Sequence, residues 1–110
     1  EAFVLGTKLG LEPKQLFDLV QASSGGSWVF SDRMPRVLAN DYTARARLDI
    51  LRKDISLLIA TAKEQGYSTP IANAVQEIYV RASEMGLGEL DDAALAMAYA
   101  RWEEVGLPES

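Results

Sequence analysis

Apolar residues in this chain recur at steps of three and four along the sequence, which is the period of an α-helix that packs on one side. The clearest case is the segment 48–65, which is followed by Gly66, a typical helix stop. Its apolar face carries Leu51, Ile55, Leu58, Ile59 and Ala62. No segment alternates apolar and polar residues with a period of two, as a half-buried strand does. The sequence therefore predicts an all-α fold, built as a compact multi-helix domain.

Proline and small residues predict where the helices before this segment begin and end. Pro13 suits the first turn of a helix that ends at the small residues 23–26. A new helix starts at Ser27 and is expected to be interrupted by Pro35, because proline removes a backbone donor from a helix interior. Residues 40–43 then read as a loop.

Two further helices are predicted after the segment 48–65. Pro70 opens the first, which ends at 85–88, and Asp91 and Asp92 cap the second. The helix after Pro13 is expected to have an apolar face made of Leu16, Leu19 and Val20. The face of the helix after Pro70 is expected to contain Ile71, Ala74, Val75, Ile78, Tyr79 and Ala82. The face of the helix after Asp92 is expected to contain Leu95, Ala98, Tyr99, Trp102 and Val105.

Composition excludes several classes of function. A length of 110 residues fits one ordinary domain, and 48% hydrophobic residues suffice for a buried core. The chain has no cysteine and no histidine, so disulfides, thiol nucleophiles, Ser-His-Asp catalysis and the usual zinc sites are excluded, and we expect no metal site. Apolar runs such as 57–60 are short and no signal-peptide pattern opens the chain. We expect a cytoplasmic protein that does not associate with membranes.

Residues 1–10 are helical in composition but have no capping residue before their apolar positions. This pattern indicates a helix that has been cut in the middle. We therefore expect residues 1–110 to form a single helical domain excised from a longer protein, with the missing part on the N-terminal side.

Charge is distributed unevenly along the chain. The net charge of −5 disfavours nucleic acid as a partner. The stretch 33–53 nevertheless holds six basic and two acidic residues, whereas 54–110 holds three basic and ten acidic residues. The basic stretch either faces an anionic ligand or forms a loosely paired, solvated surface, and its spacing alone does not decide between the two.

Asp54 is the strongest local oddity because all its neighbours at steps of three and four are apolar. These neighbours are Ile50, Leu51, Leu57 and Leu58. A carboxylate on an apolar face needs a partner, and backbone N–H groups or an arginine are favoured over a ligand on these residues alone. Lys53 is adjacent and has Asp49 four residues before it, a spacing typical of an ordinary exposed ion pair.

Two other features carry weaker signals. Residues 23–27 could offer backbone N–H groups to an anion, but a helix–turn–helix junction explains these small residues equally well. Residues 86–88 lack the third glycine of a dinucleotide-binding loop. The aromatic residues are expected in the core or at an interface rather than in a base-stacking platform. They are Trp28, Phe30, Tyr79, Tyr99 and Trp102.

Five blocks follow one another in a specific order and spacing: 1–11, 23–28, 48–54, Pro70 and 86–92. Together they resemble the C-terminal helical domain of the β-hydroxyacid dehydrogenase family, which includes 3-hydroxyisobutyrate dehydrogenase. The residues around 48–50 and 86–93 are most similar to the L-threonate dehydrogenase branch.

The resemblance implies the C-terminal domain of a 6-phosphogluconate dehydrogenase-like enzyme. Such an enzyme is an oxidoreductase that uses NAD or NADP and transfers hydride between the nicotinamide and a small hydroxy acid. Its Rossmann domain, glycine-rich loop and catalytic lysine would lie upstream of Glu1, so this fragment would contain no catalytic residue and would be inactive alone. The helical domain would supply one wall of the active site and the contacts of a homo-oligomer such as a dimer.

The resemblance also assigns roles to two residues. Lys53 matches the lysine that reaches the nicotinamide end of the cofactor, and Asp54 matches the acid that follows it and orients it or anchors the helix beside the substrate. Many relatives have an aromatic residue seven positions before this lysine, where this chain has Ala46. Either Tyr42 fills that space or the pocket is wider, so the substrate does not follow from the relatives.

An alternative of a different class is a non-catalytic helical protein-interaction module. Composition and periodicity do not distinguish this module from the dehydrogenase domain. A glycine-rich dinucleotide-binding loop upstream of Glu1 would indicate the dehydrogenase. On either interpretation, apolar surface left uncovered by excision should make the isolated chain associate with itself.

Overall fold

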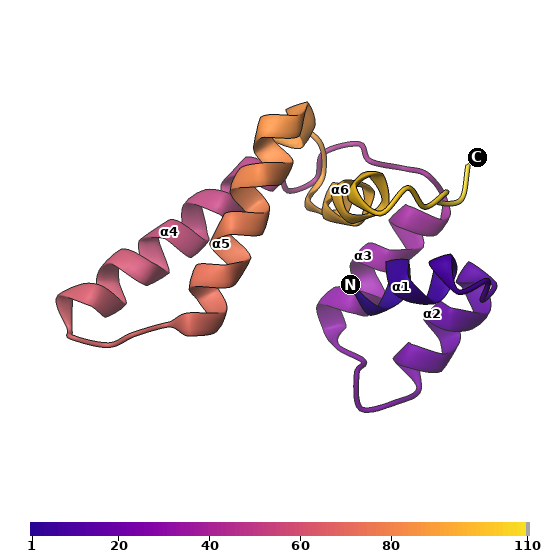
Figure 1. Cartoon of the computed structure of the whole chain (residues 1–110), viewed down its shortest axis with the longest axis horizontal. Helices are drawn as coiled ribbons and strands as arrows, with labels where there is room; N and C mark the ends of the chain where they lie inside the picture. Colours follow the sequence, from indigo (N-terminus) through magenta and orange to yellow (C-terminus); the bar gives the residue numbers. More distant parts are fainter. Residues whose placement is uncertain (110) are drawn as a thin grey trace. The chain divides into compact units, whose positions relative to one another are not determined.

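The computed structural model describes residues 1–109, and all their regular structure is helical (Figure 1). Among these residues the only β-type pairing is one isolated antiparallel bridge between Arg47 and Asp91. The all-α prediction is therefore confirmed. The chain divides into two compact units, one formed by residues 1–43 together with residues from 96 onward, and the other by residues 44–95.

The first unit contains α1 (Ala2–Lys8), α2 (Pro13–Gln21), α3 (Trp28–Leu38) and nearly all of α6 (Leu95–Trp102). Helix α1 packs on α2, and α2 packs on α3. Gly6 lies where α1 meets α2, and a Cβ there would require the Leu16 side chain to move. The rings of Phe17 and Phe30 stack with centroids 5.6 Å apart between α2 and α3.

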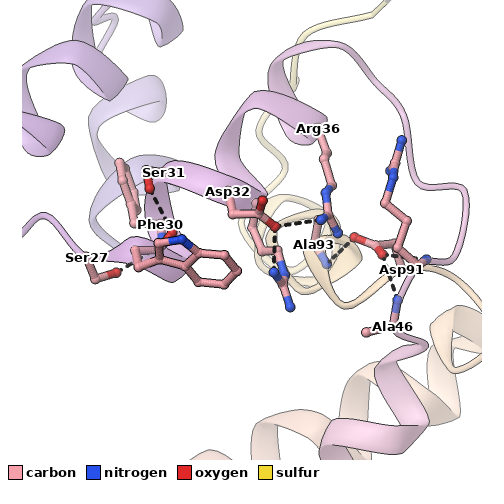
Figure 2. Close-up of polar contacts among 11 residues, drawn as sticks. Ser27, Phe30, Ser31, Asp32, Arg36, Ala46, Asp91 and Ala93 are labelled. Carbon is pink, nitrogen blue, oxygen red and sulfur yellow. Dashed lines mark hydrogen bonds and ion pairs between the residues drawn. The ribbon is translucent and has the colours of Figure 1, made fainter.

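Pro35 does not interrupt the third helix, contrary to the prediction. It lies inside α3, which continues to Leu38, and the Ala39 N–H donates to the Pro35 carbonyl at 3.0 Å. The missing donor of one proline removes a single helical hydrogen bond, and three further residues of helix follow it. The predicted start is confirmed, because the Ser27 hydroxyl accepts the Phe30 N–H at 3.0 Å as an N-terminal cap (Figure 2).

The second unit is built on two helices, α4 (Leu48–Glu64) and α5 (Pro70–Ala82), which lie side by side and antiparallel (Figure 1). The predicted starts and the predicted stop are confirmed, since Gly66 follows α4 with φ 68°, a left-handed conformation that suits glycine. The Gln76 amide donates to the Ser56 hydroxyl at 3.0 Å and ties the two helices together.

Helix α5 continues into a wider turn, η1 (Ser83–Leu87), in which Gly86 adopts φ 87°. A short 3-10 turn, η2 (Asp92–Ala94), then leads into α6. Both turns lie against α4, so the segment between α5 and α6 packs on the same helix as α5 does.

Part of the predicted apolar face is exposed on α2, α4 and α5, whereas no residue of the face predicted for the last helix is exposed. Leu48 and Ala82 are buried, but Leu19, Leu58 and Ile71 are exposed to 65%, 53% and 81%. A helix of a two-helix hairpin buries only the side that faces its partner, so the outer part of a broad apolar face stays uncovered. Over residues 1–109, no helix is both long enough and apolar enough to cross a membrane.

Candidate functional site

Lys53 lies on α4, five residues after the helix begins at Leu48. Its side chain is 64% exposed, and its Nζ lies 3.5 Å from Oδ1 of Asp54, whose side chain is 56% exposed. An exposed ion pair of this kind constrains its lysine weakly, because water screens the attraction and both side chains keep much of their freedom. The Lys53 ammonium is therefore held only loosely within the second unit.

The expectation that Asp54 sits in an apolar environment is wrong for this chain. The apolar neighbours one turn further along α4, Leu57 and Leu58, are themselves 58% and 53% exposed. No other helix among the described residues covers this part of α4 closely enough to bury them. Asp54 therefore remains hydrated, and its ion-pair partner is Lys53 rather than a helix N-terminus or an arginine.

Lys53 is an exposed residue, as its spacing from Asp49 predicted, but its ion-pair partner is Asp54 and not Asp49. The Asp49 carboxylate lies 4.0 Å from a guanidinium nitrogen of Arg52 and packs against the backbone of Gly88. Within residues 1–109 its Oδ1 is buried and has no hydrogen-bond partner. Asp49 thus faces the turn that follows α5, whereas Lys53 points toward solvent.

The beginning of α4 is held by a distant part of the chain, residues 88–92, here called the clasp segment. The Leu48 N–H donates to the Leu90 carbonyl at 2.9 Å, and the Asp49 N–H donates to the Gly88 carbonyl at 3.0 Å. These donors belong to the first turn of the helix, where backbone N–H groups have no partner within the helix. The clasp segment thus takes the place of a side-chain cap at this end of α4.

Asp91 is the central polar residue of the clasp segment and is fully buried. Its Oδ1 accepts the N–H groups of Arg45 at 2.9 Å and Ala46 at 3.3 Å, and its Oδ2 accepts the Ala93 N–H at 3.2 Å (Figure 2). The predicted capping role of Asp91 is confirmed by the bond from Ala93. The bonds to residues 45 and 46 were not predicted, because no local pattern shows that an aspartate will bind backbone N–H groups 45 and 46 residues away.

The basic stretch 33–53 is largely paired within each unit. Arg33 and Arg36 both bind Asp32 at 2.6 Å in the first unit. In the second unit, the guanidinium of Arg47 lies 2.9 Å from the Glu89 carboxylate. These pairs favour the interpretation of a paired surface over that of an open anion site.

Residues 23–27 form a helix–turn–helix junction between α2 and α3. Gly26 packs so closely on backbone carbonyls that a Cβ there would lie 2.9 Å from the Gln21 oxygen. Trp28, which follows, is 72% exposed and lies under the Arg33 guanidinium at 5.9 Å from its ring centroid. Trp28 is thus a surface residue of the first unit and does not lie in its core.

Tyr42 lines a cavity of about 240 Å³ in the first unit. The other walls come from α6 and the segment after it, including Met97, Arg101 and Leu107. Burial raises the pKa of the Tyr42 hydroxyl above its ordinary value. Residues 1–109 contain no group of three acidic, histidine or cysteine side chains arranged to hold a metal ion.

Comparison with known proteins identifies the class to which this arrangement belongs. A family model described as NAD-binding of NADP-dependent 3-hydroxyisobutyrate dehydrogenase matches residues 1–99. The match covers almost the whole chain and places it among NAD-binding proteins. The chain belongs to the family of NADP-dependent 3-hydroxyisobutyrate dehydrogenases, and the nicotinamide cofactor class that the sequence resemblance implied is confirmed for that family.

The similarity extends to curated proteins and to a solved structure. The chain is 34% identical to L-threonate dehydrogenase of Cupriavidus necator over 99% of its own length and 37% of the relative. It is 33% identical to L-threonate dehydrogenase of Escherichia coli K12, over 91% of the chain and 33% of the relative. The crystal structure of 3-hydroxyisobutyrate dehydrogenase from Salmonella typhimurium matches with a TM-score of 0.84 and 34% identity, over 87% of this chain and 34% of that one. The chain therefore spans about a third of the length of these relatives.

Proposed function

We propose that this chain is the C-terminal helical domain of a longer NAD(P)-dependent oxidoreductase that transfers hydride between a nicotinamide cofactor and a small hydroxy acid. The similar proteins named above are dehydrogenases of L-threonate and 3-hydroxyisobutyrate, and both compounds are small hydroxy acids with a carboxylate. A dinucleotide-binding Rossmann fold needs a parallel sheet, and residues 1–109 contain only helices. In this proposal the sheet belongs to the remaining two thirds of the enzyme.

The observation that carries the proposal is the position of Lys53. It is a cation on a helix whose start is fixed by hydrogen bonds, yet its side chain is 64% exposed and tied only weakly to Asp54. The backbone of Lys53 is held firmly while its ammonium group remains mobile. This combination suits a residue that binds a negatively charged ligand held by another part of the protein.

The residues present fit an anionic nicotinamide dinucleotide and a carboxylate substrate. The cofactor, when bound, supplies or accepts the hydride. Lys53 would hold a positive charge close to the nicotinamide end and the substrate carboxylate, and the Coulomb attraction would strengthen as the closed cleft excludes water. Asp54 would limit the directions of the ammonium through the ion pair that the two side chains form at 3.5 Å. Ala46, in place of an aromatic residue, would leave the pocket wider near Lys53.

The domain is also proposed to contribute the contacts of a homo-oligomer. Leu57, Leu58 and Ile71 on α4 and α5 are more than half exposed in this chain. Exposed apolar patches of this kind mark surfaces that pack on another protein part. The same observation is what supports the alternative function, a non-catalytic helical interaction module.

One experiment separates the two functions. The longer protein that contains this chain is expressed and assayed for reduction of NAD and NADP with L-threonate, 3-hydroxyisobutyrate and related hydroxy acids, and the 110-residue chain is assayed in parallel. Turnover by the longer protein and none by the isolated chain are expected. Absence of cofactor binding and turnover in the longer protein would favour the interaction module.

A further inference from the structure

We infer that the clasp segment, residues 88–92, is a positioning element for Lys53, an inference that rests on the proposed function. Lys53 has no strong contact of its own, because its partner Asp54 is exposed and adjacent in sequence. The location of its ammonium is therefore set by where the first turns of α4 lie. Whatever fixes these turns also fixes the region that the Lys53 side chain can reach.

The clasp segment fixes the axial position of α4. The residue before the helix, Arg47, makes no capping bond with its side chain, so the first turn depends on outside acceptors. Leu90 and Gly88 provide them through their carbonyl groups, at 2.9 Å and 3.0 Å from the Leu48 and Asp49 nitrogens. Two backbone bonds from one short segment prevent the helix from sliding along its axis without losing both.

Asp91 fixes the chain that leads into α4. Its buried carboxylate accepts the N–H groups of Arg45 and Ala46, and the Asp92 N–H donates back to the Ala46 carbonyl at 2.8 Å. Buried polar groups that lose such partners are costly, so this pairing has few alternatives. The two segments are therefore joined in one register, which the isolated bridge between Arg47 and Asp91 also reflects.

The contact between Asp49 and Gly88 fixes the rotation of α4 about its axis. Asp49 lies four residues before Lys53, and therefore about one helical turn away along α4. Its carboxylate packs on Gly88 with no space for a Cβ. A second tie comes from Arg52, whose guanidinium donates to the Ser83 hydroxyl at 3.1 Å. Rotation that moved Lys53 would have to break both contacts.

A double-mutant cycle in the longer dehydrogenase tests this inference. Gly88→Ala places a methyl group where the Asp49 carboxylate lies, so that the carboxylate or the first turn of α4 must move, and it is combined with Lys53→Ala. We expect Gly88→Ala to lower kcat/KM by about tenfold or more when Lys53 is present, since a displacement of about 1 Å can cost about a hundredfold. In the Lys53→Ala background the same change should cost less than about twofold, because the group that it displaces is gone.

A control and a second variant keep the test decisive. Ile59→Ala removes part of a half-buried apolar side chain in the second half of α4, away from the clasp segment, and should lower stability without moving the start of α4. Asp91→Asn keeps an oxygen acceptor and serves if Gly88→Ala does not fold. Hydrogen–deuterium exchange of the peptide spanning residues 48–53, measured without cofactor, should accelerate in the Gly88 or Asp91 variant and stay unchanged in Ile59→Ala.

The outcomes distinguish the inference from the proposed function. Equal losses of kcat/KM from Gly88→Ala in both backgrounds, or unchanged exchange over residues 48–53, would overturn the positioning role while Lys53 kept its own. Normal activity of Lys53→Ala alone would instead contradict the role proposed for Lys53, and with it the inference.

Discussion

The carboxylate of Asp49 and the backbone of Gly88 are in direct contact, although they are 39 residues apart in the sequence. A methyl group at position 88 would overlap the carboxylate, so Gly88→Ala should lower the free energy of unfolding by about 1–3 kcal/mol, as overpacking usually does. Adding Asp49→Ala removes the obstacle and should recover most of the loss. Urea unfolding of the two single variants and the double variant checks this, and additive losses would contradict the contact.

Removal of the Asp91 carboxylate should be among the most destabilising single changes in the second unit. Asp91→Ala leaves three backbone N–H groups without their acceptor, and the expected loss is about 3 kcal/mol. Glu89→Ala is the matched control, since the Glu89 side chain is 76% exposed and pairs with Arg47 at the surface. Thermal and urea unfolding should show a large shift for Asp91→Ala and little change for Glu89→Ala.

The helices of this protein could be predicted from the sequence because their signals are local. Pro13, Pro70 and Gly66 each mark a helix end through their own backbone preferences, and the structure places the ends there. Pro35 shows the limit of such signals. Losing one backbone hydrogen bond at Pro35 costs less free energy than ending α3 there, and this comparison cannot be made from the proline alone.

The site was predicted less completely, because its architecture depends on contacts between residues far apart in sequence. The capping role of Asp91 could be predicted from the helix that follows it, but not its bonds to Arg45 and Ala46. Asp54 was expected to be surrounded by apolar groups because periodicity shows which residues share a face, not whether another element covers it. The roles of Lys53 and Asp54 toward a ligand come from family resemblance and stay predictions.

Stability at high pH should report on Tyr42. Burial raises the pKa of its hydroxyl in the folded protein above the ordinary value of 10.0, so the folded state holds this proton more tightly than the unfolded state does. The contribution of Tyr42 to the free energy of unfolding is complete below pH 10, and it is lost as the pH rises through the higher pKa of the folded state. Urea unfolding at a series of pH values above 9 should show that the free energy of unfolding falls as the pH rises. This fall should be smaller in Tyr42→Phe.

The comparison variant for this titration is Tyr67→Phe. Tyr67 is 70% exposed, so its replacement removes a tyrosine while leaving the buried hydroxyl of Tyr42 in place. This variant should keep the fall in stability seen in the parent chain. An identical fall in the parent and in Tyr42→Phe would show that Tyr42 makes no contribution.

Self-association of the 110-residue chain should depend on the outer face of α4. Leu57 and Leu58 are more than half exposed there, and their burial between two copies would remove apolar surface from water. Leu58→Glu should weaken association by about tenfold or more, and Lys63→Glu, near the end of the same helix, should have a much smaller effect. Light scattering over a range of micromolar concentrations measures both. A monomer at every concentration for the parent chain would contradict the prediction.

Lys53 and Lys63 provide a matched pair for testing the proposed role of Lys53. Both are exposed lysines on α4, so replacing either by alanine removes one positive charge from the same helix and should change stability little. In the longer dehydrogenase, Lys53→Ala should lower kcat/KM by about 10²–10³-fold, the usual effect of removing one electrostatic contact to the reacting groups. Lys63→Ala should leave kcat/KM nearly unchanged.

Lys53→Arg keeps the charge with a different shape and should retain part of the activity. Because the contact is electrostatic, the weaker substrate binding of Lys53→Ala should also depend less on salt than that of the parent enzyme. Steady-state kinetics at two ionic strengths tests both statements, and equal effects of the two alanine variants would remove Lys53 from the site.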